Sequence, residues 1–539
     1  MKSVLIAAAI ISSVVTTRSE DFDVIIRHGR VVDGSGNPAF FADVGVKKGR
    51  ITAIGRVDGK AKTEIDATGL IVAPGFIDVH THADELGASR RARANTNNES
   101  VFESWQPRAE NFLRMGVTSV VVGNCGGSTL DVGKFFDNVK RNQISINTAT
   151  LIGHNTVREK AMGGSFDRPP TPAELAKMKS YVDAAMKDGA VGLSTGLIYL
   201  PGVFSKTDEI VELAKVASAY GGIYASHMRH EDSCIYEALD EVIAVARGAH
   251  IRAEVSHIKL AGERSWHQAD KVLAYIEKAR ASGLDITEDQ YAYTASSTTM
   301  RQLIPDEAFD GGKKKFLEII ADPDKKAKLV AEMKQKIHAR GREDYAYAVI
   351  ASYRHDKSLN GLNIVEATKK VRGSDSLADQ IEFILEMEKN GSASGVFHGM
   401  NEEDLATFMR HPNTMIACDS GLRKFGESVP HPRGYGNNAR VLGRYVRELK
   451  VLRLEDAIRK MTSLPANTFQ LKQRGELRDG NWADIVVFDP EKITDPATYN
   501  DPHHYATGIP HVLVNGVPVI KDNEHTGAKP GMGLRHVAK

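Results

Sequence analysis

Two histidines one residue apart, His80 and His82, close an apolar run that begins at Ile71. Successive side chains of a β-strand point to opposite faces, so both imidazoles project from the same side, as two ligands of one metal ion must. A bare His-x-His pair is equally compatible with two partly exposed loop histidines. The pair therefore predicts a metal site only if further ligands accompany it.

Four further candidate ligands stand at the ends of other strand-like runs. They are Cys125, His227, His257 and Asp419. Zinc binds imidazole nitrogen, thiolate sulfur and carboxylate oxygen, and a catalytic zinc keeps one position open for water. Calcium or magnesium calls for an oxygen-rich set instead. The donor set therefore favours zinc, and the thiolate of Cys125 could bridge two ions.

Strand-then-helix alternation predicts how the fold brings these ligands together. Eight strands can be placed, at about 71–79, 117–122, 147–152, 190–194, 222–226, 251–256, 284–288 and 414–418. The helices between them carry ordinary start signals, such as the capping box Thr171-Pro-Ala-Glu174. In an eight-stranded barrel the carboxyl ends of the strands converge on one mouth. The predicted fold class is α/β, a (β/α)8 barrel of the TIM type.

Three further segments are predicted around the barrel, which we place at 71–470. Short β-type runs at both chain ends, 21–70 and 471–539, are expected to pair into one small β-sandwich beside the barrel. The gap between the last two barrel strands is too long for one βα unit. We therefore expect an inserted lid or subdomain over 300–392, with a role in covering the mouth, in packing or in oligomer contact.

Composition points to a soluble enzyme that acts on a small molecule. Lysines and arginines number 70 against 69 acidic residues, which gives no reason to expect nucleic acid or an acidic membrane as partner. Composition carries no signal for an oligomeric state. Three cysteines are too few for a disulfide scaffold. Cys234 and Cys418 are interpreted as buried small residues.

The N-terminal residues combine one positive charge with an apolar run too short to span a bilayer easily. Residues 1–20 are therefore predicted to be a signal peptide, with export to a bacterial periplasm or the extracellular space. The region lacks a clear Ala-x-Ala cleavage pattern, so an uncleaved anchor and a cytoplasmic protein with an apolar extension remain alternatives. No other membrane partner is expected.

Several of these motifs together resemble the N-acyl-D-amino-acid deacylase (D-aminoacylase) family of the metal-dependent amidohydrolase superfamily. The resemblance covers the chain from about residue 22, apart from a weakly patterned middle. Its motifs include the His80/His82 pair, Gly123-Asn-Cys125-Gly, Ser226-His227-Met-Arg, Ser256-His257-Ile-Lys259, Asp289-Gln-Tyr291-Ala-Tyr293, His431-Pro-Arg433 and Ala483-Asp-Ile-Val-Val-Phe-Asp489.

The resemblance implies how one or two zinc ions would be held. Cys125, His227 and His257 would form the tighter site, while His80 and His82 would hold a weaker ion that shares Cys125. Ring-opening relatives in the superfamily typically bridge two metals with a carboxylated lysine at the end of the fourth strand. Here that strand reads Ala190-Val-Gly-Leu-Ser-Thr-Gly196, without a lysine.

The expected chemistry is hydrolysis of an amide, because a metal makes water nucleophilic near neutral pH and polarises the scissile carbonyl. Asp419 is the predicted general base, which would take a proton from water and hand it to the departing amine. The alternative is a carboxylate that only ligates the metal.

Recognition of a free α-carboxylate needs a cation near the mouth. Lys259 lies two residues after His257, hence on the same strand face, and Arg433 offers a planar bidentate fork. The resemblance implies that these two and Tyr291 hold the carboxylate and that Tyr199 lies at the bound substrate. Without the resemblance, each of these four residues would be interpreted as a surface charge or a core aromatic.

Other residues leave alternatives open. His154 ends the third strand and could donate to the carbonyl oxygen, support a metal ligand or be a satisfied core histidine. Arg301 could pair with an acidic substrate side chain or be exposed, and His230 and His398 are interpreted as structural. Ala292 and Asn437-Asn438-Ala439 depart from the family pattern near the predicted binding face.

Three functions are therefore compatible with the sequence. The first is hydrolysis of N-acyl-D-amino acids. The second is another hydrolysis on the same scaffold, by a dipeptidase, lactonase or cyclic-amide hydrolase. The third is a binding protein that kept the fold and lost the reaction.

Overall fold

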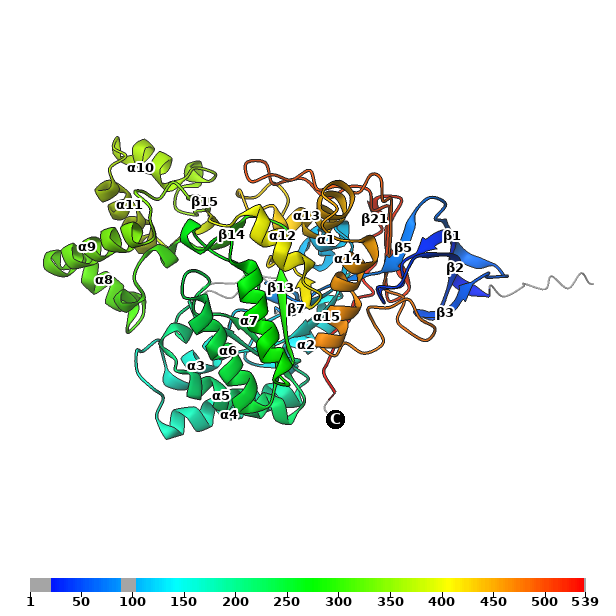
Figure 1. The fold of residues 1–539 in the computed structure, drawn as a ribbon, viewed down its shortest axis with the longest axis horizontal. Helices are drawn as coiled ribbons and strands as arrows, with labels where there is room; N and C mark the ends of the chain where they lie inside the picture. The colour runs from blue at the N-terminus through cyan, green and yellow to red at the C-terminus, as the bar shows by residue number, and fades with distance from the viewer. Residues whose placement is uncertain (1–20, 89–102, 538–539) are drawn as a thin grey trace, which may run out of the picture.

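The computed structural model describes residues 21–88 and 103–537 (Figure 1). The predicted signal peptide, residues 1–20, lies outside the described residues. Within the described ranges, every helix is too short or too polar to cross a lipid bilayer.

Eight strand positions form a parallel barrel, as predicted. They are β6 (Phe76–Asp78), β7 (Val117–Val122), β8 (Asn147–Thr150) continued by β9 (Ile152–Gly153), β10 (Gly192–Gly196), β11 (Ile223–His227), β12 (Arg252–Val255), β13 (Ile286–Gln290) and β17 (Thr414–Ile416). The barrel closes where Thr81 pairs with Ser420 and the Asp419 amide donates to the His80 carbonyl at 2.9 Å. The first and eighth strands are thereby joined, which confirms the predicted fold class.

The predicted first strand, 71–79, is wrong in one respect, because the chain changes sheet inside it. β5 (Ile71–Pro74) pairs antiparallel with β18 (Ile485–Phe488), whereas β6 begins after Gly75 and pairs with β7. A Cβ at Gly75 would lie 2.3 Å from the hydroxyl of Thr118, so only glycine fits this crossing. Both halves are buried and apolar, and hydrophobic periodicity therefore gives no sign of the break.

Strands from the two chain ends pair with one another, as expected of the predicted β-sandwich, and they belong to one nine-stranded sheet. Besides β5 and β18 it contains β1 (Phe22–Val31), β2 (Phe40–Lys47), β3 (Arg50–Gly55), β4 (Ala61–Asp66), β19 (His511–Val514), β20 (Val517–Lys521) and β21 (Glu524–His525). The antiparallel pair β5 and β18 connects the two ends. The cluster of buried side chains in this sheet consists mainly of valine and isoleucine. Figure 1 shows the strands β1, β2 and β3 at the right-hand end of the molecule.

The expected insertion between the last two barrel strands is present and has its own hydrophobic core. An antiparallel sheet of β14 (Ala295–Thr299), β16 (Ser394–His398) and β15 (Ala348–Ser352) connects it to the barrel. Four helices contribute to the core of the insertion, namely α8 (Lys313–Ala321), α9 (Pro323–Ala339), α10 (Ile364–Arg372) and α11 (Leu377–Lys389). Figure 1 shows these helices at the end of the molecule opposite β1 to β3. The strands β14 and β16 flank the predicted range 300–392.

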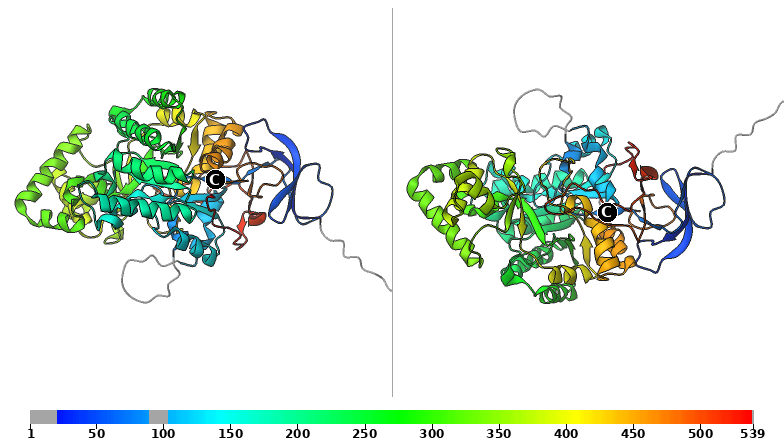
Figure 2. Two further views of the ribbon diagram at one scale, coloured as in Figure 1. Left: turned by 90° about the horizontal axis from the view of Figure 1, so that it is seen from below. Right: turned by 90° about the horizontal axis from the view of Figure 1, so that it is seen from above.

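The remaining helices surround the barrel, and Figure 2 shows them from two further sides. They are α1 (Glu110–Arg114), α2 (Val132–Asn142), α3 (His154–Met162), α4 (Pro172–Lys187), α5 (Thr207–Ala219), α6 (Ile235–Ala249), α7 (Ala269–Ala281), α12 (Glu402–Arg410), α13 (Arg433–Arg440) continued by the π-helix η8 (Val441–Glu448), α14 (Leu454–Met461) and α15 (Ser463–Thr468). The predicted capping box opens α4, with Thr171 accepting from the amide of Glu174. The main core lies between this helix layer and the strands.

Candidate metal centre

All six predicted ligands lie at the carboxyl ends of barrel strands. His80 and His82 follow β6, Cys125 follows β7, His227 ends β11, His257 follows β12 and Asp419 follows β17. Because parallel barrel strands end at one mouth, ligands from distant parts of the sequence come together there.

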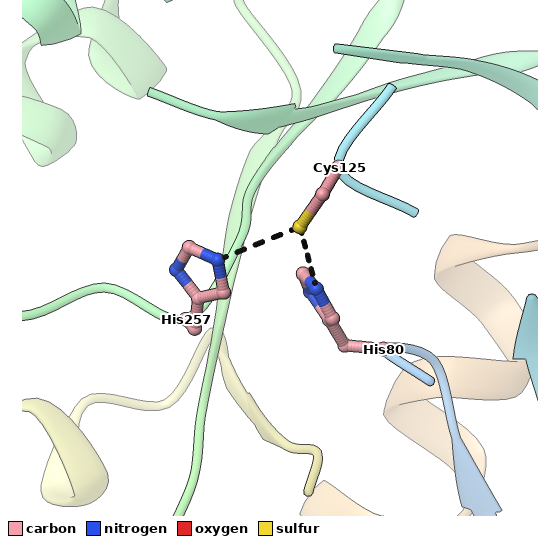
Figure 3. A group of neighbouring side chains, drawn as sticks. All are labelled: His80, Cys125 and His257. Carbon is pink, nitrogen blue, oxygen red and sulfur yellow. Dashed lines mark hydrogen bonds between the residues drawn. The ribbon is translucent and has the colours of Figure 1, made fainter. Parts of the chain in front are cut away.

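The thiol of Cys125 is the centre of a first group of donor atoms (Figure 3). Its Sγ lies 3.3 Å from Nε2 of His80, 3.4 Å from Nδ1 of His227 and 3.8 Å from Nε2 of His257. Nδ1 of His227 and Nε2 of His257 are 2.8 Å apart. Donors about 2.0–2.3 Å from a tetrahedral zinc are separated by about 3–4 Å. The three sulfur–nitrogen distances and the donor types therefore fit a zinc ion, whereas the two histidine nitrogens lie slightly closer together than this range.

A second group lies beside the first and shares His80 with it. Oδ1 of Asp419 lies 3.1 Å from Nε2 of His82 and 3.7 Å from Nε2 of His80. The ligand atoms of these three residues all lie within 4.8 Å of one another. This arrangement is compatible with the expected division into two metal sites. His80 Nε2, expected at the second site, is nevertheless as close to the Cys125 thiol as His227 Nδ1, expected at the first.

Three of these residues adopt the left-handed backbone conformation that non-glycine residues rarely use. The φ angles are +52° at Cys125, +37° at His257 and +50° at Asp419. Such conformations cost about 1–3 kcal/mol each and occur mainly at functional sites. They end the regular strand geometry and turn the three side chains toward one centre.

The electrostatic surroundings favour the charged forms of the thiol and the carboxyl group. Burial alone would raise the pKa of Cys125, but the charges of His80 and His227 and the hydrogen bond to His227 bring it well below its usual value. Burial would likewise raise the pKa of Asp419, whereas Arg433 and His80 hold it well below the usual range. A thiolate is the form of cysteine that binds metals, and a carboxylate is the form that accepts a proton.

Asp289, a residue without a predicted role, supports two of the histidines. Its Oδ2 lies 3.2 Å from Nδ1 of His80, and its Oδ1 accepts from the amide of His257 at 3.0 Å. Metal-binding histidines are typically oriented by a carboxylate on the nitrogen that does not face the metal. The available signal was an acidic residue near the end of the seventh barrel strand.

Glu231 was also missed, and it connects a predicted ligand to a predicted substrate residue. Its Oε1 lies 2.9 Å from Nδ1 of His257 and accepts from Nζ of Lys259. With Nε2 of His257 directed to the metal site, Nδ1 carries the proton and donates to Glu231. The signal that could have found this residue is its position four residues after His227.

Lys259 lies beside His257, as predicted. The two residues do not share a strand face, however, which was the argument for this prediction. Strand β12 ends at Val255, and the left-handed His257 interrupts the alternation of side chains beyond it. The ammonium group nevertheless comes within 2.8 Å of Nδ1 of His257 because both contact Glu231.

Arg433 opens α13 and is buried beside the second group of donors. Its Nη2 lies 2.9 Å from Oδ2 of Asp419 and 3.3 Å from the carbonyl of Ser297. The guanidinium carbon lies 4.6 Å from the centre of the buried Tyr291 ring. Nε and Nη1 are buried and have no hydrogen-bond partner among the described residues. Unpaired buried donors are costly, so an acceptor such as a carboxylate is expected there.

Tyr199 connects the metal site to the insertion. Its ring packs edge-on against His227, with centroids 4.8 Å apart. Its hydroxyl lies 3.0 Å from Oγ1 of Thr298, a residue of β14. The insertion therefore contacts the mouth of the barrel through its sheet.

His154 contacts the helix layer instead of the predicted ligands. Its Nε2 lies 2.8 Å from Oε1 of Glu209 on α5, and the other oxygen of Glu209 binds Arg158 at 2.6 Å. All three side chains are buried. These contacts favour the interpretation of His154 as a core histidine.

The donor groups include no atom of four other residues discussed from the sequence. Arg301 places its guanidinium 5.4 Å from the centre of the Phe309 ring inside the insertion. The ring of His398 lies 4.8 Å from that of Tyr499. Cys418 is buried as expected, but Cys234 is only half-buried at the start of α6, so the prediction for it was wrong.

Comparison with known proteins gives consistent matches. The profile of the amidohydrolase family matches residues 63–520. A D-aminoacylase of Alcaligenes xylosoxydans xylosoxydans is 33% identical over 96% of this chain and 99% of its own length. An N-acyl-D-glutamate deacylase of the same organism is 34% identical over 96% of this chain and 98% of its own length. The crystal structure of N-acyl-D-glutamate deacylase from Bordetella bronchiseptica, complexed with zinc and a phosphonate inhibitor, is 32% identical with a TM-score of 0.79, over 96% and 100%.

Proposed function

Because the chain belongs to the amidohydrolase family, we propose that it hydrolyses the amide bond of N-acyl-D-amino acids. The products are a carboxylate and a free D-amino acid. One observation carries the proposal: the Cys125 thiol lies within 3.8 Å of three imidazoles at the barrel mouth, with Asp419 beside them. The names of the similar proteins support the substrate class and the D configuration.

The residues present fit zinc, as one ion or two. His227 and His257 would hold the first ion together with Cys125, and His80 and His82 would hold a second. Bound zinc supplies a water that is nucleophilic at neutral pH and polarises the scissile carbonyl.

Asp419 is the general base in the proposed reaction. Its carboxylate accepts a proton from the attacking water as the carbon–oxygen bond forms. The same group then donates that proton to the amine nitrogen as the carbon–nitrogen bond breaks. Contacts with His82 and Arg433 hold the carboxylate in place on both sides.

Arg433, Lys259 and Tyr291 are proposed to bind the α-carboxylate of the substrate. Nε and Nη1 of Arg433 are buried without a partner among the described residues, and a substrate carboxylate would accept a hydrogen bond from one of them. The Lys259 ammonium lies 5.9 Å from the centre of the Tyr291 ring, so the two side chains are neighbours. Tyr199, packed on His227, would border the substrate at the reacting bond.

Ring-opening activity is disfavoured by β10, which consists of Gly192-Leu-Ser-Thr-Gly196 and offers no lysine for carboxylation. A panel of substrates distinguishes deacylase activity from dipeptidase, lactonase and cyclic-amide hydrolase activity. Zinc-loaded protein is assayed with N-acetyl-D- and N-acetyl-L-amino acids, dipeptides, lactones and cyclic amides. Release of free D-amino acid only from the N-acetyl-D compounds is expected. Preferential turnover of a ring or dipeptide substrate would replace the proposal with that activity.

We also propose that the protein is exported. The support is the single lysine and apolar run within residues 1–20. Expression of the full chain in a bacterium, followed by cell fractionation and N-terminal sequencing, tests this. A mature chain that begins near residue 20 outside the cytoplasm is expected, and an intact cytoplasmic N-terminus would contradict export.

A further inference from the structure

A cavity of about 370 Å³ lies where the sheet of the insertion approaches the barrel mouth. This volume is within the range of small-molecule sites. Strands β14, β15 and β16 contribute hydroxyl groups to its wall, and the segment between β17 and α13 contributes a cation. The lining includes Ser297, Thr298, Ser352, Ser394, Arg354 and Arg423.

The cavity shares a wall with the proposed substrate site. Thr298 lines it and also contacts the hydroxyl of Tyr199 at 3.0 Å. Ser297 lines it as well, and its carbonyl accepts from Nη2 of Arg433 at 3.3 Å. A substrate whose α-carboxylate is held at Arg433 would therefore have the cavity next to it.

Arg423 gives this cavity a cation that the protein does not neutralise. Its Nε donates to the hydroxyl of Ser420 at 3.1 Å, and both Nη groups lack a partner among the described residues. Arg354, at the exposed edge of the cavity, has no ion pair within the described part of the chain. A planar guanidinium with two free donors matches a carboxylate in bidentate geometry.

The other charged groups of the cavity form no ion pair with Arg423 within the described part of the chain. Lys424 is already paired, at 3.4 Å from Glu103 and 3.8 Å from Glu427. Glu85 lines the cavity, but it forms no ion pair with Arg423 in the described residues, and its Oε2 is buried without a partner. Burial raises the pKa of Glu85, and the nearby charge of Arg423 opposes that rise. An anionic ligand would find positive charge and hydroxyl donors here.

We propose that this cavity binds a second carboxylate of the substrate, with Arg423 as its main anchor and Arg354 at its edge. The inference rests on the proposed function and narrows the substrate class to N-acyl-amino acids with two carboxylates. The second carboxylate belongs either to the amino-acid side chain or to the acyl group. Arg301, the candidate from sequence for this task, lies over Phe309 instead.

Matched substrates test the subsite. The zinc-loaded full chain is assayed with N-acetyl-D-glutamate against N-acetyl-D-glutamine, and with N-succinyl-D-alanine against N-butyryl-D-alanine. The acidic member of one pair is expected to have a kcat/KM about tenfold or more above its neutral partner. The pair that shows the preference identifies the source of the second carboxylate. No preference in either pair would overturn the proposal.

Variants assign the preference to Arg423. Arg423→Gln is expected to bring the ratio of acidic to neutral kcat/KM close to one. Lys424→Gln, which removes an already paired cation from the same loop, is the matched control and should keep the ratio. A ratio unchanged in Arg423→Gln would overturn the assignment. Thermal melting of each zinc-loaded variant checks that it is folded.

Binding without turnover separates this inference from the proposed function. Calorimetric titration of the zinc-loaded protein measures its affinity for D-glutamate, D-glutamine, succinate and butyramide. This measurement tests the cavity even if no amide is cleaved. About tenfold tighter binding of D-glutamate or of succinate than of its neutral counterpart, lost in Arg423→Gln, is expected. Equal affinities would overturn the subsite, whereas inactivity with every N-acyl-amino acid would overturn the proposed function alone.

Discussion

Arg433 and Asp419 are in direct contact, with Nη2 of the guanidinium 2.9 Å from Oδ2 of the carboxylate. The proposed substrate anchor and the proposed general base are therefore coupled before any substrate binds. The other carboxylate oxygen faces His82 at 3.1 Å. A change at Arg433 should consequently affect both substrate affinity and the protonation of Asp419.

Replacement of Arg433 by alanine is the first prediction. The loss of charge-assisted hydrogen bonds worth about 1.5–3 kcal/mol should raise KM for N-acyl-amino acids about 10- to 100-fold. Arg433 lowers the pKa of Asp419 against the effect of burial. Without it that pKa rises, so the base becomes protonated at a higher pH. The acidic limb of the kcat/KM profile should move to higher pH.

Arg433→Lys is the matched control for this prediction. It keeps a positive charge but loses the planar fork, so the acidic limb should move less while KM still rises. Steady-state kinetics between about pH 4 and 9 measure both quantities. An unchanged KM and an unchanged acidic limb in Arg433→Ala would remove Arg433 from the site.

Asp419→Asn tests the general base. Positioned acid–base groups contribute about 10²–10⁴-fold to rate, and this carboxylate serves in two proton transfers. The turnover number should fall by about that factor or more, while the zinc held by Cys125, His227 and His257 remains. Metal analysis by atomic emission and single-substrate kinetics check the two parts. An enzyme with normal turnover would refute the role, and loss of all zinc would favour a purely ligating carboxylate.

Cys125→Ser tests the shared thiolate. The serine hydroxyl stays protonated at neutral pH and is a far weaker zinc ligand. Zinc content per chain and activity should both fall sharply. Cys234→Ser is the control, because that half-buried thiol lies at the start of α6 and away from the donor groups. Circular dichroism establishes that both variants are folded. Full zinc content in folded Cys125→Ser would contradict the proposed site.

Asp289→Asn tests the support behind the ligands. Removing an outer partner of a metal-binding histidine typically costs 10- to 100-fold in metal affinity, so zinc affinity should fall by about that factor. Competition with a chromophoric chelator measures it. Glu209→Gln is the matched control, since Glu209 is also a buried carboxylate in contact with a histidine, His154. It should lower stability by about 1–3 kcal/mol and leave zinc affinity unchanged.

The ligand set and the barrel could be predicted because both depend on local patterns. Each predicted barrel strand after the first lies within two residues of its observed bounds. Once the strands are parallel, the residues at their carboxyl ends must meet at one mouth, whatever the details of packing. His80 and Cys125 were therefore found without a structure.

The break at Gly75 and the position of Lys259 required the structure. Hydrophobic periodicity is the same on both sides of a change of sheet, so it predicted one strand where β5 and β6 belong to different sheets. The left-handed residue His257 removes the alternation that the sequence argument assumed. Both errors come from backbone geometry that residue type alone does not encode.

The sequence by itself determined which donor atoms are available, on which strand ends, and hence the family and the chemistry. Only the tertiary structure decided which partner each of them has: Asp289 for His80, Glu231 for His257 and Arg433 for Asp419. His80 and Asp289 are 209 positions apart. Their contact depends on the register of six intervening barrel connections and on side-chain directions at the mouth, which no short-range pattern in the sequence records.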